Sequence, residues 1–73
     1  MSGLKITNQV KRLRFLNGEL TQAQLADKIG VTRQTIHAIE TGKYQPSLEV
    51  AFKLSNAFGV TIEDVFEVTG ETV

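Results

Sequence analysis

Residues 21–42 read TQAQLADKIGVTRQTIHAIETG, and this stretch carries the strongest structural signal in the chain. Thr21 and Gln24 have the spacing of a capping box, in which two side chains close the start of a helix. Gly30 is a stop signal for that helix, Thr32 is a good cap for the next one, and a second glycine ends it. The pattern therefore predicts two short helices joined by a tight turn.

The residues between these caps meet the steric demands of a helix-turn-helix. Two helices that cross at about 90–120° over three or four residues need a small residue where they touch. Ala26 stands at that position, and Gly30 accepts the positive φ of the turn at the least cost. Apolar residues fill the inward positions: Leu25, Ile29, Val31, Ile36 and Ile39. A plain amphipathic hairpin meets only some of these constraints, so we interpret the segment as a DNA-binding helix-turn-helix.

The second helix of the motif begins with polar residues on its outward side: Thr32, Arg33, Gln34 and, one turn on, His37. In a helix-turn-helix this face enters the major groove with its N-terminal end first. Arginine pairs with guanine O6 and N7, and glutamine with adenine N6 and N7, so we expect Arg33 and Gln34 to read bases. For His37, the roles of base reader, phosphate donor and bystander are all open.

Residues that flank the two helices are candidates for contacts with the DNA backbone. Gln22 begins the first helix, where its amide and the nearby backbone N–H groups can lie against a phosphate. Lys43 and Tyr44 follow the second helix and can hold another phosphate together with the start of the next helix. An ordinary exposed loop is the alternative for residues 43–45.

Three more helices and two strands are expected outside the motif. The helices cover about residues 8–18, residues 47–59, and a short segment from Thr61, where Asp64 completes another capping box. The expected inward residues of the first two are Val10, Leu13, Leu16, Leu48, Ala51, Phe52, Leu54, Ser55 and Phe58. Residues 4–7 and 67–69 alternate apolar and polar side chains, which is typical of strands, and frayed tails are the alternative.

The composition is that of one small globular domain over residues 1–73. There is no cysteine and only one histidine, so no metal site is expected, and neither paired carboxylates nor a nucleophile with a base suggests an enzyme or a cofactor. No apolar run approaches the roughly 20 residues that a membrane span needs, and the first residues do not resemble a signal peptide. We therefore expect a cytoplasmic protein.

The zero net charge conceals an uneven distribution along the chain. Residues 1–45 contain seven basic and three acidic residues, a net charge of +4, whereas residues 46–73 contain one basic and five acidic residues, a net charge of −4. A basic face can approach phosphates while the acidic end points away from them. Chance clustering in a short chain is the alternative interpretation.

Several sequence blocks resemble the Cro/cI-type (XRE) helix-turn-helix family, and in particular its very short single-domain members. The blocks are Leu13-Arg14, Leu20-Thr21-Gln22, Leu25-Ala26, residues 30–36, Ile39-Glu40, Gly42-Lys43-Tyr44 and Pro46-Ser47-Leu48. The resemblance covers about residues 8–66 and implies the all-α, lambda-repressor-like fold of five helices. It also implies specific operator binding as a homodimer, usually with repression. Its base-reading positions fall on Thr32, Arg33, Gln34 and His37, and its phosphate-binding positions on Gln22, Thr41, Lys43 and Tyr44.

The resemblance further implies an internal ion pair between Arg14 and Glu40. The segment that leads from this arginine to the second helix is one residue longer than is usual in the family, so Gly18-Glu19 is expected to form a looser turn. With that departure, Arg12 is an alternative partner. A partner of some kind is needed because an uncompensated carboxylate near the core is costly.

The C-terminal part contains more apolar residues than a small core easily absorbs: Val50, Val60, Ile62, Val65, Phe66 and Val68. We expect a two-fold interface within about residues 50–73, because one such domain reads only about four or five base pairs. The dimer would place two recognition helices about 34 Å apart on a palindrome. An antitoxin that binds a toxin protein and its own promoter is the alternative function.

Overall fold

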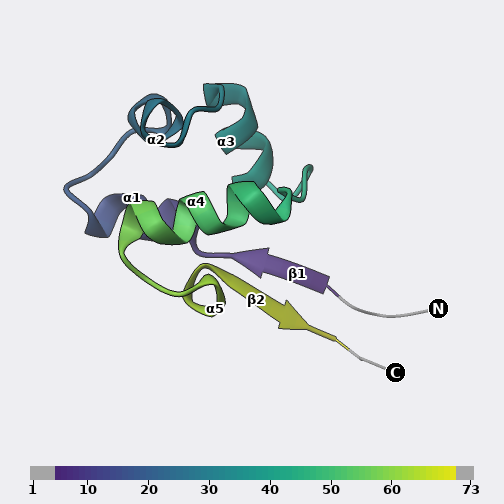
Figure 1. Cartoon of the computed structure of the whole chain (residues 1–73). Helices are drawn as coiled ribbons and strands as arrows, with labels where there is room; N and C mark the ends of the chain where they lie inside the picture. The colour runs from purple at the N-terminus through teal and green to yellow at the C-terminus, as the bar shows by residue number, and fades with distance from the viewer. Residues whose placement is uncertain (1–4, 71–73) are drawn as a thin grey trace.

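Five helices and two short strands follow one another along residues 5–70, the part of the chain that this computed structural model describes (Figure 1). In chain order they are β1 (Lys5–Asn8), α1 (Val10–Leu16), α2 (Gln22–Ile29), α3 (Arg33–Glu40), α4 (Leu48–Phe58), α5 (Ile62–Val65) and β2 (Phe66–Thr69). Each helix predicted from caps and spacing is present. Within the described residues, none of these helices has the length and apolar character needed to cross a bilayer.

Hydroxyl side chains cap four of the five helices. The residue before each of α2, α3, α4 and α5 accepts the backbone N–H three residues later: Thr21, Thr32, Ser47 and Thr61. In α2 and α5 the reciprocal side-chain bond is also present, so both predicted capping boxes are confirmed. Each cap is worth about 1 kcal/mol, which matters because helices of four to eleven residues are too short to persist alone.

The core lies where α4 packs against α1, α2 and α5, with α3 held on α2. Its buried apolar residues are Val10, Leu25, Ala26, Ile29, Ile36, Ile39, Ala51, Leu54, Phe58 and Val65. Between α2 and α3, Gly30 has φ 77° and donates its N–H to the Ala26 carbonyl at 2.8 Å. The predicted close crossing at a small residue, with a left-handed glycine in the turn, is therefore confirmed.

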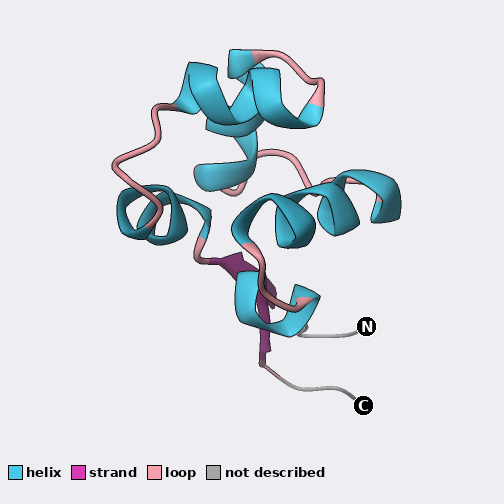
Figure 2. Ribbon diagram, turned by 60° about the vertical axis from the view of Figure 1, so that its left-hand side comes forward, coloured by secondary structure: helices cyan, strands magenta, loops and turns pink. Residues whose placement is uncertain are grey.

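The two strands pair in antiparallel register, with Ile6 opposite Val68. They lie beside α5 and below the other helices, at the opposite end of the molecule from α2 (Figures 1 and 2). The N–H of Gln9 donates to the Val65 carbonyl at 2.8 Å and continues this connection into α1. The predicted pairing of the terminal segments is confirmed, although Leu4, the first residue of the expected strand, lies outside the described residues.

Three residues that were expected to face inward are exposed: Leu16 at 68%, Leu48 at 71% and Phe52 at 52%. The inward side of α4 is formed by Ala51, Leu54, Ser55 and Phe58, the spacing of one helix face. Phe52 points about 100° away from that face, and Leu48 lies on the first turn, beyond the edge of the core. Leu16 is the last residue of α1, which ends two residues earlier than predicted.

Candidate DNA-binding surface

The first turn of α3 carries exposed polar side chains above a buried apolar side. Ile36 and Ile39 are almost completely buried, whereas Arg33, Gln34 and His37 are exposed. Residues at i, i+3 and i+4 of a helix share one side, so the structure brings these three predicted readers together on a single strip. The strip can donate and accept hydrogen bonds in the way that base edges require.

Thr32 stands directly before this strip, and its hydroxyl is used to start the helix. Its Oγ1 accepts the N–H of Thr35 at 3.1 Å and lies 2.9 Å from the Thr35 hydroxyl. The side chain therefore fixes the geometry of the first turn, on which the orientation of Arg33 and Gln34 depends.

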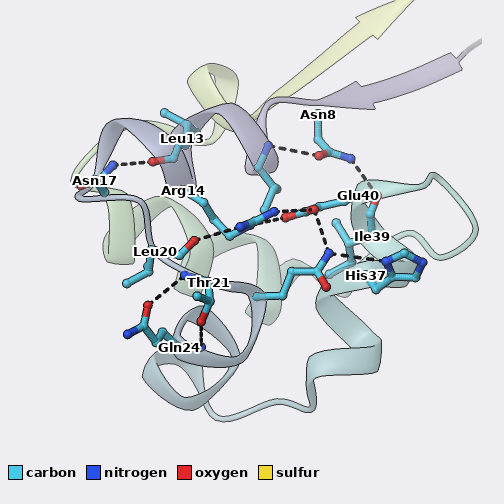
Figure 3. A network of polar contacts seen from close by, with 12 residues as sticks. Asn8, Leu13, Arg14, Asn17, Leu20, Thr21, Gln24, His37, Ile39 and Glu40 are labelled. Carbon is cyan, nitrogen blue, oxygen red and sulfur yellow. Dashed lines mark hydrogen bonds and ion pairs between the residues drawn. The ribbon is translucent and has the colours of Figure 1, made fainter.

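A buried ion pair anchors the other end of α3 to α1. Arg14 donates from Nε to Glu40 Oε2 at 2.6 Å and from Nη2 to Oε1 at 3.1 Å (Figure 3). Its third nitrogen, Nη1, donates to the Leu20 carbonyl at 2.8 Å, and only 8% of the residue is exposed. The partner of Glu40 is thus Arg14, and Arg12 does not replace it.

The extra residue in the connection from α1 to α2 is absorbed by two left-handed residues. Gly18 has φ 78° and Glu19 has φ 56°. After this turn the N–H of Leu20 donates to the Arg14 carbonyl at 2.9 Å, which brings the Leu20 carbonyl within reach of the guanidinium. The longer connection therefore supports the ion pair instead of displacing it.

Gln22 points toward α3 in this structure. Its Nε2 donates to Glu40 Oε1 at 3.0 Å and lies 3.4 Å from His37 Nδ1 (Figure 3). The sequence predicted that both the Gln22 amide and the nearby backbone N–H groups could bind a phosphate. The amide nitrogen is occupied within the protein, so only the backbone N–H groups at the start of α2 remain as donors. The sequence pattern contained no signal for this contact.

The predicted phosphate-binding residues after α3 surround the end of that helix. The Thr41 hydroxyl donates back to the carbonyls of His37 at 3.0 Å and Ala38 at 3.3 Å. The N–H groups of Lys43 and Tyr44 also donate to the Ala38 carbonyl, at 2.9 and 3.2 Å, while both side chains are exposed. The backbone of this loop is therefore fixed, and its side chains are free to reach a partner.

The helix-turn-helix family model matches residues 10–65 of the chain, which includes all five helices. The protein belongs to the XRE-type helix-turn-helix family. It is a transcriptional regulator with a helix-turn-helix DNA-binding domain, and it is not an enzyme, as the sequence predicted.

Related regulators cover most of this XRE-type chain. An HTH-type transcriptional regulator of Methanocaldococcus jannaschii is 59% identical over 59 residues, which are 81% of this chain and 88% of that one. One from Bacillus subtilis is 51% identical over the same shares, and a Mycoplasma control protein is 34% identical over 90% of this chain and 92% of its own. The crystal structure of transcriptional regulator VanUg, 15% identical, has the same fold, with a TM-score of 0.74 over 97% of this chain and 93% of that one.

Sequence reasoning missed one residue that positions α3 in this XRE-type domain. Asn8 was expected to start α1, but it is the last residue of β1, and α1 begins at Val10, whose N–H donates to Asn8 Oδ1 at 3.1 Å. Its Nδ2 also donates to the Ile39 carbonyl at 2.9 Å, which satisfies a carbonyl in the last turn of α3 (Figure 3). Two residues that are 31 positions apart meet here, and no local pattern in the sequence indicates such a contact.

The residues expected at a dimer interface occupy different depths in the structure. Val65 is completely buried in the core, Val50, Val60, Ile62 and Phe66 are half-buried, and Val68 is 54% exposed. A shallow groove at this end is lined by Ile6, Pro46, Leu48, Ile62, Phe66 and Val68, among others. Val65 cannot reach a partner, whereas Ile6 and Leu48, which were not expected there, can.

Proposed function

We propose that this regulator is a repressor that binds a palindromic operator as a homodimer. The observation that carries the proposal is the polar strip of Arg33, Gln34 and His37, held on a helix whose other end is fixed by the buried Arg14–Glu40 pair. Base readers must keep their geometry to discriminate, and a helix with a capped first turn and an anchored last residue provides that geometry.

The contacts divide into readers and positioners. Arg33 is suited to guanine and Gln34 to adenine in the major groove. Lys43, Tyr44 and the backbone N–H groups at the start of α2 are suited to phosphates on either side of the groove. Glu40 contacts no DNA in this scheme, because both of its oxygens are used inside the protein.

The dimer is supported by the apolar residues left exposed beside the sheet. We call Ile6, Leu48, Phe52 and Val68 the sheet–α4 patch; all are between 38% and 71% exposed. An exposed apolar group of this kind marks a contact surface. A typical interface buries about 800 Å² on each partner, about a sixth of the 4989 Å² that this chain exposes.

A second copy is the occupant that fits this surface. Although the C-terminal part is acidic, Glu49 lies 3.3 Å from Lys53 on α4, on the helix strip beside Leu48 and Phe52, so the charges next to the patch form a neutralised pair. Gln45 and Pro46, which follow α3 closely in the chain, line the same groove. We place the two-fold axis through the patch in the orientation that brings both copies of α3 to one side, as a palindrome with half-sites about 34 Å apart requires.

Selection from random duplex DNA tests the reading of the operator. We expect a palindromic motif whose preference relaxes at one symmetric position with Arg33→Ala and at another with Gln34→Ala, each at a cost of about 1–3 kcal/mol. A reporter gene with the selected motif across its promoter should be expressed less when the protein is present. A motif without symmetry contradicts the dimer, and higher expression contradicts repression.

Sedimentation tests the sheet–α4 patch. Wild-type protein should sediment as a dimer at micromolar concentration, and Leu48→Lys should sediment as a monomer with its fold intact. Leu16→Lys is a matched control, because it places the same charge on an equally exposed leucine of α1. Monomeric wild-type protein with and without DNA, or equal effects of the two variants, contradicts the proposed interface.

A further inference from the structure

We infer that Gln22 holds His37 as the tautomer protonated on Nε2, so that His37 reads DNA as a hydrogen-bond donor. The inference rests on the proposed function, since it assumes that the strip of Arg33, Gln34 and His37 faces DNA. It assigns a role to the residue of this strip whose role the sequence left open. It also specifies the partner chemically: an acceptor atom, on a base edge or on a phosphate.

The argument begins at Glu40, whose surroundings require a carboxylate. Both of its oxygens accept from the Arg14 guanidinium, at 2.6 and 3.1 Å, and the side chain is 7% exposed. An ionised carboxylate only accepts hydrogen bonds. The Gln22 side-chain atom 3.0 Å from Oε1 must therefore be the amide nitrogen, and its orientation is determined by Glu40.

The same nitrogen then determines the state of His37. An amide NH2 group has two hydrogens and no lone pair available to accept a bond. One hydrogen is directed to Glu40, and the other is available for His37 Nδ1, which lies 3.4 Å away. Nδ1 must accept, because an N–H on this atom would face the N–H of Gln22. A neutral imidazole that accepts at Nδ1 carries its proton on Nε2.

The proton on Nε2 faces away from this network. Figure 3 shows the second ring nitrogen of His37 on the side of the ring opposite to the dashed line that marks the Nδ1 contact. The residue is exposed and lies three and four positions after Gln34 and Arg33, so the N–H belongs to their strip. It can donate to guanine O6 or N7, adenine N7, thymine O4 or a phosphate oxygen. Cytosine N4 and adenine N6 are donors themselves and are excluded as partners.

The tautomer can be measured in the free protein, without DNA. The ¹⁵N chemical shifts of the two ring nitrogens at pH 8 identify which of them carries the proton. We expect wild-type His37 to be protonated on Nε2 alone and Gln22→Met to show both tautomers in exchange. Gln34→Met is the matched control. It should leave the tautomer of His37 unchanged, because no hydrogen bond joins Gln34 to the ring within residues 5–70. A proton on Nδ1 in the wild type, or no effect of Gln22→Met, overturns the inference.

Two substitutions of His37 test the donor on DNA. Glutamine can place an amide nitrogen near the position of Nε2, whereas the shorter asparagine places one near Nδ1. We expect His37→Gln to keep the affinity and His37→Asn to lose about two- to tenfold, the effect of one hydrogen bond. A loss confined to certain base pairs identifies a base acceptor, and a uniform loss with a shallower salt dependence identifies a phosphate. Equal affinities of both variants and the wild type overturn the donor role.

The two experiments separate this inference from the proposed function. Specific operator binding together with a tautomer that does not respond to Gln22→Met overturns the role of Gln22 and leaves the proposed function intact. The expected tautomer in a protein without specific DNA binding overturns the proposed function, and the donor then has no DNA partner.

Discussion

The α2–α3 unit, residues 22–40, and the sheet–α4 patch differ in the kind of side chain that each exposes. In the α2–α3 unit, polar groups find partners inside the chain: Gln22 and Glu40 form one connected network with Arg14 of α1. What this unit leaves exposed is polar. In the sheet–α4 patch, the exposed groups are apolar, such as Leu48 and Val68, and nothing in residues 5–70 covers them. The first unit satisfies its polar groups within one chain, whereas the second is the surface that we propose a second copy covers.

This difference suits a short chain of 73 residues that has to divide its proposed roles. A core of ten buried apolar residues is small, and half of these residues lie on α2 and α3. Apolar residues such as Leu48 and Val68, which a larger protein would cover with more core, remain exposed at the edge of this one. We therefore expect substitutions in the α2–α3 unit to act on stability, and substitutions in the patch to act on the proposed association.

The largest effect is expected where the α2–α3 network is broken from one side. Glu40→Ala leaves Arg14 buried without a charge partner and should lower the free energy of unfolding by about 3–5 kcal/mol, measured by urea denaturation. Replacing both partners, with Arg14→Met and Glu40→Leu together, should restore most of this loss. A single substitution that costs less than about 1 kcal/mol would show that the ion pair does not organise the unit.

The helix crossing gives the next largest effect. Ala26→Leu adds volume where α2 and α3 touch and should cost about 1–3 kcal/mol in thermal or urea unfolding. Ala23→Leu makes the same change on the exposed side of α2 and should stay within about 0.5 kcal/mol of the wild type. Similar losses from both variants would mean that the crossing is less tightly packed than the burial of Ala26 indicates.

The charge difference between the two regions can be tested by the salt dependence of DNA binding. Lys43→Ala should weaken binding to all sequences alike and reduce the slope of log K against log salt by about one. Lys53→Ala removes the same charge from α4 and should leave the slope unchanged, since that lysine pairs with Glu49. An equal reduction of the slope in both variants would place phosphates near both regions.

The smallest effect is expected in the turn between α1 and α2. Glu19 has a left-handed backbone that costs a non-glycine residue about 1–2 kcal/mol. Glu19→Gly removes this cost and adds flexibility to the unfolded chain, so we expect a net gain of about 0.5–1 kcal/mol. Gly18→Ala should lower the free energy of unfolding in the same measurement, because alanine is strained at a φ of 78°. The added methyl meets no atom within 4 Å, so it gains no contact that offsets this strain. A stabilising Gly18→Ala would contradict this account of the turn.

Local chemistry explains how much of the fold could be predicted. The caps at Thr21, Thr32 and Thr61 act over three residues, so a short window of sequence contains all the information they need. The crossing at Ala26 and Gly30 is equally local. The strands were predictable from alternation, and their pairing followed because no other strand was expected.

The remaining features depend on contacts between distant residues. Asn8 reaches Ile39, and Gln22 reaches His37, across 31 and 15 positions. A polar side chain in sequence does not reveal which distant carbonyl or ring it will meet. The exposure of Leu48 is a similar case, because hydrophobicity indicates a preference for burial and not whether a small core extends far enough to provide it.

The antiparallel pairing of residues 5–8 with residues 66–69 has a consequence for synthesis on the ribosome. The helix-turn-helix and α4 are complete once residue 58 has left the exit tunnel, but β1 has no partner until the last described residues follow. The carbonyl of Val65 that anchors the start of α1 emerges equally late. Asn8, which joins this junction to α3, gains its fixed surroundings only then. The finished position of α3 is therefore reached only after residues 65–69 have emerged, so a chain interrupted before them would carry the motif without this support.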